Sequence, residues 1–157
     1  MVDKYGKEHM LDDPDWQRKM LKERSISDTY TFKDGSGSVD YTGTYEKDFL
    51  MRMEVLGFKA TDIMGPSPHN YIYIYEDEPH FYIPDFYIPN LNLEIEIKDG
   101  GDNPNNHPKI IAVDKVKEKL KDDLFTKNKK VNYFKVVNKE YDSFFNYSLD
   151  LKDMIDD

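Results

Sequence analysis

The chain has 157 residues, a formal net charge of −9 and no cysteine, which excludes disulfides, thiolate zinc sites and cysteine nucleophiles. This length suits one domain with a sizeable core. No apolar run approaches the roughly 20 residues of a membrane span and the first ten residues hold no hydrophobic signal region, so we expect a cytoplasmic protein without a membrane partner.

The acidic balance argues against a generic nucleic-acid binder, but charge is distributed unevenly. Residues 76–102 contain eight acidic residues and one lysine, whereas residues 109–139 contain ten lysines and four acidic residues. A basic segment near an acidic one is compatible with a phosphate-binding surface beside metal-binding carboxylates. An ordinary solvated surface explains the same pattern.

Residues 1–43 are predicted to form an N-terminal unit. The pair Asp13-Pro14 is typical of a helix start and predicts a short helix from about Asp15 to Arg24. Residues 25–43 are rich in Ser, Thr, Gly and Asp, which predicts a small β-ribbon.

A helix is expected from Tyr45 to Leu56, opened by Thr44 and ended by Gly57. Its apolar residues recur at helical spacing and predict a face that packs on the core. Glu46 lies in its first turn, where a carboxylate offsets the positive end of the helix dipole.

The stretch from His80 to Gly101 is predicted to form the central β-hairpin, preceded by a strand over residues 69–75. If Pro89–Asn92 forms the loop, Ile88 faces Leu93 across the ladder. The alternation of the strands then gives two faces, one apolar and one charged. The apolar face contains Phe86, Ile88, Leu93, Ile95 and Ile97, and the charged face contains Asp85, Glu94, Glu96 and Lys98.

The same register places Asp85 directly opposite Glu96. Two carboxylates in that position repel each other unless a cation lies between them. Mg²⁺ is commonly held by one or two carboxylates, with waters and substrate phosphates as its other ligands, and Lys98 adds an ammonium on the same face. The alternative is a solvated strand face, because acidic and basic residues alternate on exposed strands too.

Three further elements follow. A helix is expected from about Lys109 to Phe125, a strand over residues 129–137, and an acidic helix over residues 140–155.

Pro84-Asp85, followed after ten residues by Glu96-Ile97-Lys98, is similar to the signature of the PD-(D/E)XK nuclease superfamily. The resemblance implies that Asp85 and Glu96 bind Mg²⁺ or Mn²⁺, that the Ile97 carbonyl adds a ligand, and that Lys98 assists the attacking water. It also implies that an acidic residue of the first helix, best matched by Glu46, completes the metal site.

The expected order of helix, three strands, helix and strand over residues 44–137 matches the core of that superfamily. We therefore predict an α/β (α+β) fold, with a restriction-endonuclease-like core whose mixed sheet is flanked by helices. Residues 44–157 would form the nuclease domain, behind a DNA-contact module at residues 1–43.

Basic residues are the candidates for DNA contact. The family implies that a basic residue of the helix at 109–125 reaches a substrate phosphate, and Lys115 and Lys117 fit this role. The segment Lys4–Met10 resembles small repeats beside the catalytic domains of phage-encoded and homing endonucleases. That resemblance implies DNA contacts by Lys7, Arg18, Lys19 and Lys22, whereas a capping helix with solvated charges is the alternative.

Together these features predict a divalent-metal-dependent DNA endonuclease of phage or homing type, acting in the host cytoplasm if phage-encoded. Because cutting both strands usually requires two active sites, a homodimer is consistent with this function. The alternative is a non-catalytic phage protein that binds or mimics DNA with the same fold. A glycosidase using the carboxylate pair is disfavoured, since no aromatic sugar platform is assignable.

Overall fold

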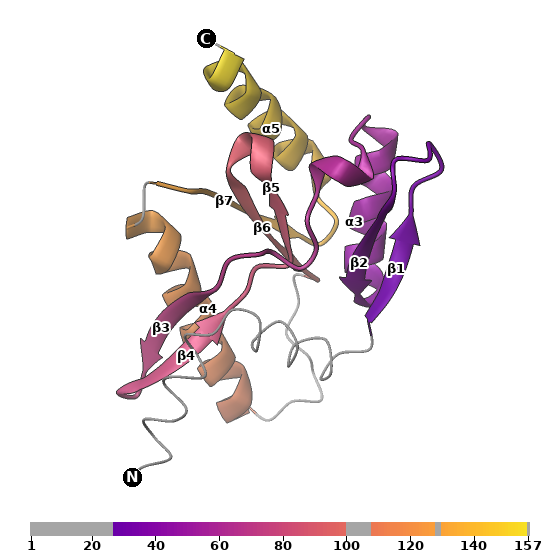
Figure 1. Cartoon of the computed structure of the whole chain (residues 1–157). Helices are drawn as coiled ribbons and strands as arrows, with labels where there is room; N and C mark the ends of the chain where they lie inside the picture. Colours follow the sequence, from indigo (N-terminus) through magenta and orange to yellow (C-terminus); the bar gives the residue numbers. More distant parts are fainter. Residues whose placement is uncertain (1–26, 100–107, 128–129, 157) are drawn as a thin grey trace.

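The computed structural model of the chain describes residues 27–99, 108–127 and 130–156 (Figure 1). Within these residues, three α-helices and seven β-strands form a mixed α/β fold whose strands belong to three small sheets. The α/β class is confirmed. The helix predicted at residues 15–24 lies outside the described residues.

The first sheet is the predicted ribbon. β1 (Ser27–Thr31) and β2 (Ser38–Thr42) pair antiparallel and lie beside the first described helix (Figure 1). Phe32 and Val39 are buried in the same core as residues of that helix. The ribbon therefore contributes to the main core of the protein.

α3 (Gly43–Val55) is the helix predicted from Tyr45, and it begins two residues earlier than expected. It buries Phe49, Leu50 and Met53. Gly57 follows its last turn with φ of 99°, a left-handed conformation that L side chains rarely adopt. The predicted stop at Gly57 is confirmed.

The central sheet has the strand order β5-β6-β7. β5 (Phe86–Ile88) and β6 (Leu93–Lys98) pair antiparallel with Ile88 opposite Leu93, as predicted. β7 (Asn132–Val137) runs parallel to β6. The connection between β6 and β7 contains α4 (Pro108–Lys127).

The long first strand predicted from His80 is wrong, because the chain changes sheet at Pro84. β4 (Glu78–Tyr82) pairs antiparallel with β3 (Tyr71–Tyr75) in a separate ribbon. Proline has no N–H for a ladder, so a strand tends to end or bend there. β5 begins two residues later and joins the central sheet.

β6 is buried on both faces, so the alternative of a solvated strand face is wrong. Leu93, Ile95 and Ile97 pack into the main core. On the other face, Glu94 and Glu96 are only 0% and 6% exposed. The ribbon β3-β4 and α4 lie on this side, where a second, aromatic core forms (Figure 1). Its residues are Tyr73, Tyr82 and Phe125, with Tyr71, Tyr75 and Tyr133 packed against them.

α5 (Tyr141–Asp156) completes the fold and buries Phe144 and Leu151 against the main core. Tyr141, at its start, donates a hydrogen bond of 2.5 Å to Asp48 and so ties α5 to α3. None of the described helices is long and apolar enough to span a bilayer.

Phe86 joins the central sheet to α3. It is fully buried and stacks on Phe49 with 5.1 Å between ring centroids. We expect Phe86→Ala to lower the free energy of unfolding by about 3–5 kcal/mol, because it leaves a cavity between two elements. Denaturant unfolding measures this, with Val55→Ala as the control, since Val55 is 78% exposed. Equal effects of the two variants would contradict the packing.

Candidate functional site

Asp85 stands at the entrance to β5, where its side chain is fixed on the neighbouring strand. Its Oδ2 accepts a hydrogen bond of 2.8 Å from the backbone N–H of Ile97 in β6. The register pairs Phe86 with Ile95, so the next pair outward is Asp85 and Glu96. The two carboxyl groups are close enough for the charge of Glu96 to raise the pKa of Asp85, as expected for residues that face each other across the strands.

Glu46 reaches the same place from α3. Its Oε1 accepts a hydrogen bond of 3.1 Å from the Thr42 N–H at the start of the helix. Phe49 lies one turn further along on the same side of α3, and its stacking on Phe86 draws this part of the helix towards Asp85. The charge of Glu46, like that of Glu96, raises the pKa of Asp85. Three carboxyl groups predicted as one site are therefore brought together.

The proximity of the acids disturbs the ionisation of Asp85 and Glu46. Burial raises the pKa of Asp85 well above its usual range, and the charges of Glu96 and Glu46 raise it further. Burial also raises the pKa of Glu46, and with the charge of Glu96 it reaches about 7 despite the hydrogen bond from Thr42. Asp85 and Glu46 therefore hold a proton more tightly than isolated carboxyl groups do.

The described residues do not assemble the predicted metal site of three carboxylates as they are arranged. Among the described residues, no group of three or more His, Cys, Asp or Glu side chains could hold a metal ion as it is arranged. Mg²⁺ usually needs only one or two carboxylates, and the contact between Asp85 and Glu96 supplies such a pair. The proposed role of the Ile97 carbonyl stays a prediction.

Lys98 lies at the end of β6, but its nearest ion-pair partner is a residue that the sequence did not indicate. Its Nζ is 2.8 Å from Oε1 of Glu118 on α4. Burial would lower the pKa of Lys98, yet the charge of Glu96 and then the bond to Glu118 raise it above the usual value. The ammonium is therefore paired with α4 and is also attracted by the charge of Glu96.

Two tyrosines of the ribbon β3-β4 cover the carboxylates of β6. Tyr71 and Tyr82 are directly opposite each other in the ribbon. The Tyr82 hydroxyl donates to Glu96, and the Tyr71 hydroxyl donates to Glu94. Sequence reasoning found neither contact, because alternating tyrosines indicate a strand but not what their hydroxyls reach.

Glu94 has a different environment from Glu96. Ser67 donates a hydrogen bond of 2.6 Å to its Oε1, and His69 Nδ1 lies 3.0 Å from its Oε2. With the Tyr71 hydroxyl, three polar groups satisfy this fully buried carboxylate. The cluster around Glu94 is thus a complete hydrogen-bonded unit beside the acidic site.

Two lysines of α4 are predicted to contact DNA, and that role stays a prediction. Lys115 is exposed, and Lys117 places its Nζ 5.4 Å from the centre of the Tyr75 ring. Lys121 lies closer, with its Nζ 4.9 Å from the centre of the Tyr82 ring. The sequence gave no reason to choose Lys121 over the other lysines of this helix. The other predicted contacts, Lys7, Arg18, Lys19 and Lys22, lie outside the described residues.

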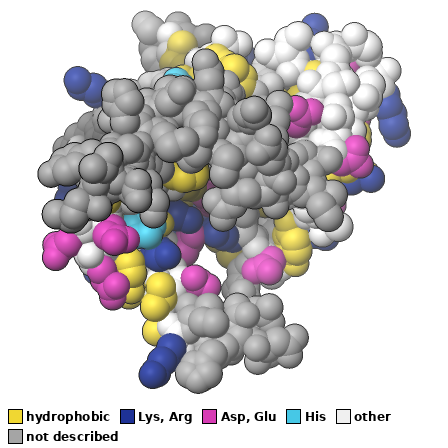
Figure 2. Space-filling view, turned by 60° about the horizontal axis from the view of Figure 1, so that its bottom comes forward, with side chains coloured by type: hydrophobic (Ala, Val, Ile, Leu, Met, Phe, Trp, Pro, Cys, Tyr) yellow, Lys and Arg dark blue, Asp and Glu magenta, His cyan; other side chains and the backbone are white. Residues whose placement is uncertain are grey.

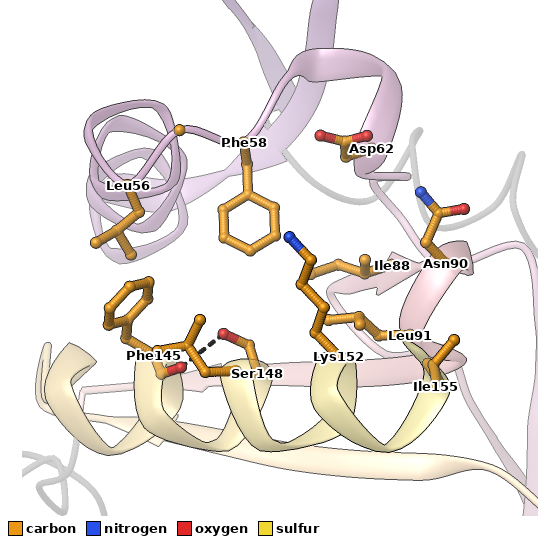
Figure 3. A pocket seen from close by; sticks show the side chains of 12 residues that line it. Leu56, Phe58, Asp62, Ile88, Asn90, Leu91, Phe145, Ser148, Lys152 and Ile155 are labelled. Atoms are coloured by element: carbon orange, nitrogen blue, oxygen red, sulfur yellow. Dashed lines mark hydrogen bonds between the residues drawn. The ribbon is translucent and has the colours of Figure 1, made fainter. Parts of the chain in front are cut away.

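Acidic and basic side chains lie next to one another on the face shown in Figure 2. A separate pocket of about 640 Å³ lies between the end of α3, the turn after β5 and α5 (Figure 3). Lys152 extends from α5 into it towards Phe58. None of the predicted catalytic residues lines this pocket, so its chemistry is separate from that of the acidic cluster.

The chain matches no protein-family model, no curated protein and no solved structure. The functional argument therefore depends on the geometry of the site.

The raised pKa values make stability depend on pH. The folded protein keeps a proton on Glu46 between its ordinary pKa of 4.5 and about 7, whereas the unfolded chain has lost it. The contribution of this group to the free energy of unfolding is therefore complete below the lower value and is lost as the pH rises through the upper one. Asp85 acts in the same direction.

We expect Glu46→Gln to raise the melting temperature of the metal-free protein, because the amide cannot ionise. The gain should be small near about pH 5 and larger near about pH 8. Thermal unfolding followed by circular dichroism in a chelating buffer measures it. A gain that is the same at both pH values would show that Glu46 is not strained by the other acids.

Proposed function

We propose that this protein is a divalent-metal-dependent DNA endonuclease that hydrolyses phosphodiester bonds. The single observation that carries the proposal is the closeness of three acids, Asp85 just before β5, Glu96 in β6 and Glu46 in α3, where the charges of the other two raise the pKa of Asp85. A buried cluster of like charges destabilises a fold unless it keeps protons or binds a cation. Lys98, two residues after Glu96, supplies an amine beside it.

The order of elements supports the same proposal. α3 carries Glu46, Asp85 directly precedes β5, β6 carries Glu96, and α4 connects β6 to the parallel strand β7. The two helices and the parallel last strand follow the order predicted for a restriction-endonuclease-like core. The strand predicted at residues 69–75 instead pairs with β4 in a separate ribbon, so the central sheet holds only two of the three strands predicted between the helices.

Each residue has a role in the proposed reaction. Asp85 and Glu96 would hold Mg²⁺ or Mn²⁺, with Glu46 as a further ligand. Bound there, the ion would polarise a phosphate oxygen and lower the pKa of a water molecule. Lys98 would orient that water or stabilise negative charge developing on the phosphate. The Ile97 N–H keeps Asp85 directed at Glu96.

A non-catalytic protein that binds or mimics DNA is the second candidate, because the net charge is −9. An acidic surface favours mimicry over DNA binding. A mimic has no need of opposed buried carboxylates, however, and those are what the site contains. A test of DNA cleavage distinguishes the nuclease from the non-catalytic protein.

We expect the protein to nick or cleave plasmid DNA with Mg²⁺ or Mn²⁺ and not in a chelator. Asp85→Ala and Lys98→Ala should each lower the rate by about 10²–10³-fold, the usual cost of losing a group that stabilises the transition state. Asp153→Ala is the matched control, because Asp153 is an exposed acid of α5. Absence of cleavage with every divalent ion and DNA form tested would favour the binding or mimicking protein.

Metal binding is testable without activity. An ion that binds only the folded state at about 100 times its Kd adds about 2.7 kcal/mol of stability. We expect Mn²⁺ to raise the melting temperature of the wild type and not of Asp85→Asn, with Asp153→Asn behaving as wild type. Calorimetric titration should show weaker binding as the pH falls below about 7, because protons then compete for Glu46. Equal stabilisation of Asp85→Asn would place the metal elsewhere.

A further inference from the structure

Glu118 is the centre of a cluster of ammonium groups next to the acidic site. Its side chain contacts three lysines from three elements: Lys98 of β6, Lys135 of β7 and Lys121 of α4 itself. The Nζ to Oε distances are 2.8 Å, 2.9 Å and 3.5 Å in that order. Its two oxygens are divided between the strands, with Oε1 on Lys98 and Oε2 on Lys135.

These contacts are more than a surface ion pair. The Glu118 side chain is 26% exposed, and the Lys98 side chain 36%. Burial disfavours the ionised form of Glu118, but the hydrogen bonds from Lys98 and Lys135 outweigh it and lower its pKa to about 2. Hydrogen bonds between two ionised groups are short and strong when they are partly shielded from water. Glu118 is therefore a fixed negative charge at one position.

A lysine needs such a partner if its amine is to act at a defined point. Its four-carbon side chain rotates freely, and its ammonium is strongly hydrated. Lys98 extends from the end of β6, and the charge of Glu96 on the same strand attracts its ammonium. Glu118 of α4 holds that ammonium in an ion pair of 2.8 Å. The ion pair with Glu118 is therefore the contact that fixes the amine.

We propose that Glu118 is the positioning residue for Lys98, which it holds at the edge of the Asp85–Glu96 pair. This inference rests on the proposed nuclease function, since it assigns Glu118 a role in that reaction. Glu118 itself does not touch the reacting phosphate. Its effect is to fix where the amine of Lys98 stands when DNA binds.

The competing explanation is that Glu118 only anchors α4 to the sheet through Lys135. The structure contains a matched control for this. Asp122, one turn further along α4, is 2.9 Å from the Nζ of Lys135, and the structure records no contact between it and Lys98. Asp122→Asn therefore removes an anchor of the same kind and leaves Lys98 held.

The experiment compares Glu118→Gln with Asp122→Asn in plasmid or duplex cleavage. Loss of a group that orients a catalytic residue typically costs 10–100-fold, and we expect a fall in kcat of about that size for Glu118→Gln. KM for DNA should stay unchanged or fall, because a negative charge has been removed near the phosphates. Asp122→Asn should keep kcat within about twofold. Equal loss in both variants, or a rise in KM with kcat unchanged, overturns the proposal.

A second measurement does not require activity. The side-chain ¹⁵N resonance of Lys98, identified by its absence in Lys98→Arg, reports whether the ammonium is held in a hydrogen bond. We expect this signal in the wild type and in Asp122→Asn, and its loss or a clear shift in Glu118→Gln. An unchanged Lys98 signal in Glu118→Gln overturns the positioning role. If the wild type cleaves nothing, the nuclease proposal fails, while this spectrum still decides whether Glu118 fixes Lys98.

Thermal unfolding of each variant shows whether it is folded. If Glu118→Gln does not fold, Glu118→Asp takes its place, because it keeps the charge on α4 but shortens the side chain by one methylene. It should lower kcat with KM unchanged and shift the Lys98 signal. Wild-type kcat and an unshifted signal in Glu118→Asp overturn the proposal.

Discussion

The burial of both faces of β6 is the constraint on which the rest of the structure depends. One face is apolar and lies in the main core, whereas the other carries Glu94 and Glu96 under a layer of tyrosines and α4. A buried carboxylate costs several kcal/mol unless hydrogen bonds or opposite charges compensate it. An apolar strand would avoid this cost, so stability alone does not explain why these acids are present.

The two carboxylates are compensated in different ways, and the difference separates a structural group from a functional one. Glu94 is surrounded by donors, from Ser67, His69 and Tyr71. Glu96 receives the Tyr82 hydroxyl, but it also faces Asp85, a group of the same charge. Glu94, whose oxygens have hydrogen-bond partners, fixes the ribbon β3-β4 on the sheet. A carboxylate that faces a second carboxylate, as Glu96 does, is stable only with a shared proton or with a cation.

The positions around the acidic pair follow from packing further away. The stacking of Phe49 on Phe86 brings α3, and with it Glu46, to the end of the sheet. On the opposite side, the parallel pairing of β6 with β7 places Lys135 next to Glu96 in register, and α4 brings Glu118 over both strands. Acidic side chains thus lie at one end of the sheet, and Lys98 and Lys135 lie beside them on Glu118. The negative charge suits a metal ion, and the neighbouring positive charge suits a phosphate.

The sequence by itself determined the local pattern: the register of Ile88 against Leu93, the stop of α3 at Gly57 and the pairing of Asp85 with Glu96. Turn residues and strand alternation act over a few residues, so they can be recognised without the fold. Only the tertiary structure decided that the charged face of β6 is buried, that the strand from His80 breaks at Pro84, and that Glu118 and Tyr82 contact the site. These outcomes depend on how β3-β4 and α4 pack on the sheet. Such contacts join residues distant in sequence, and no periodicity along the chain records them.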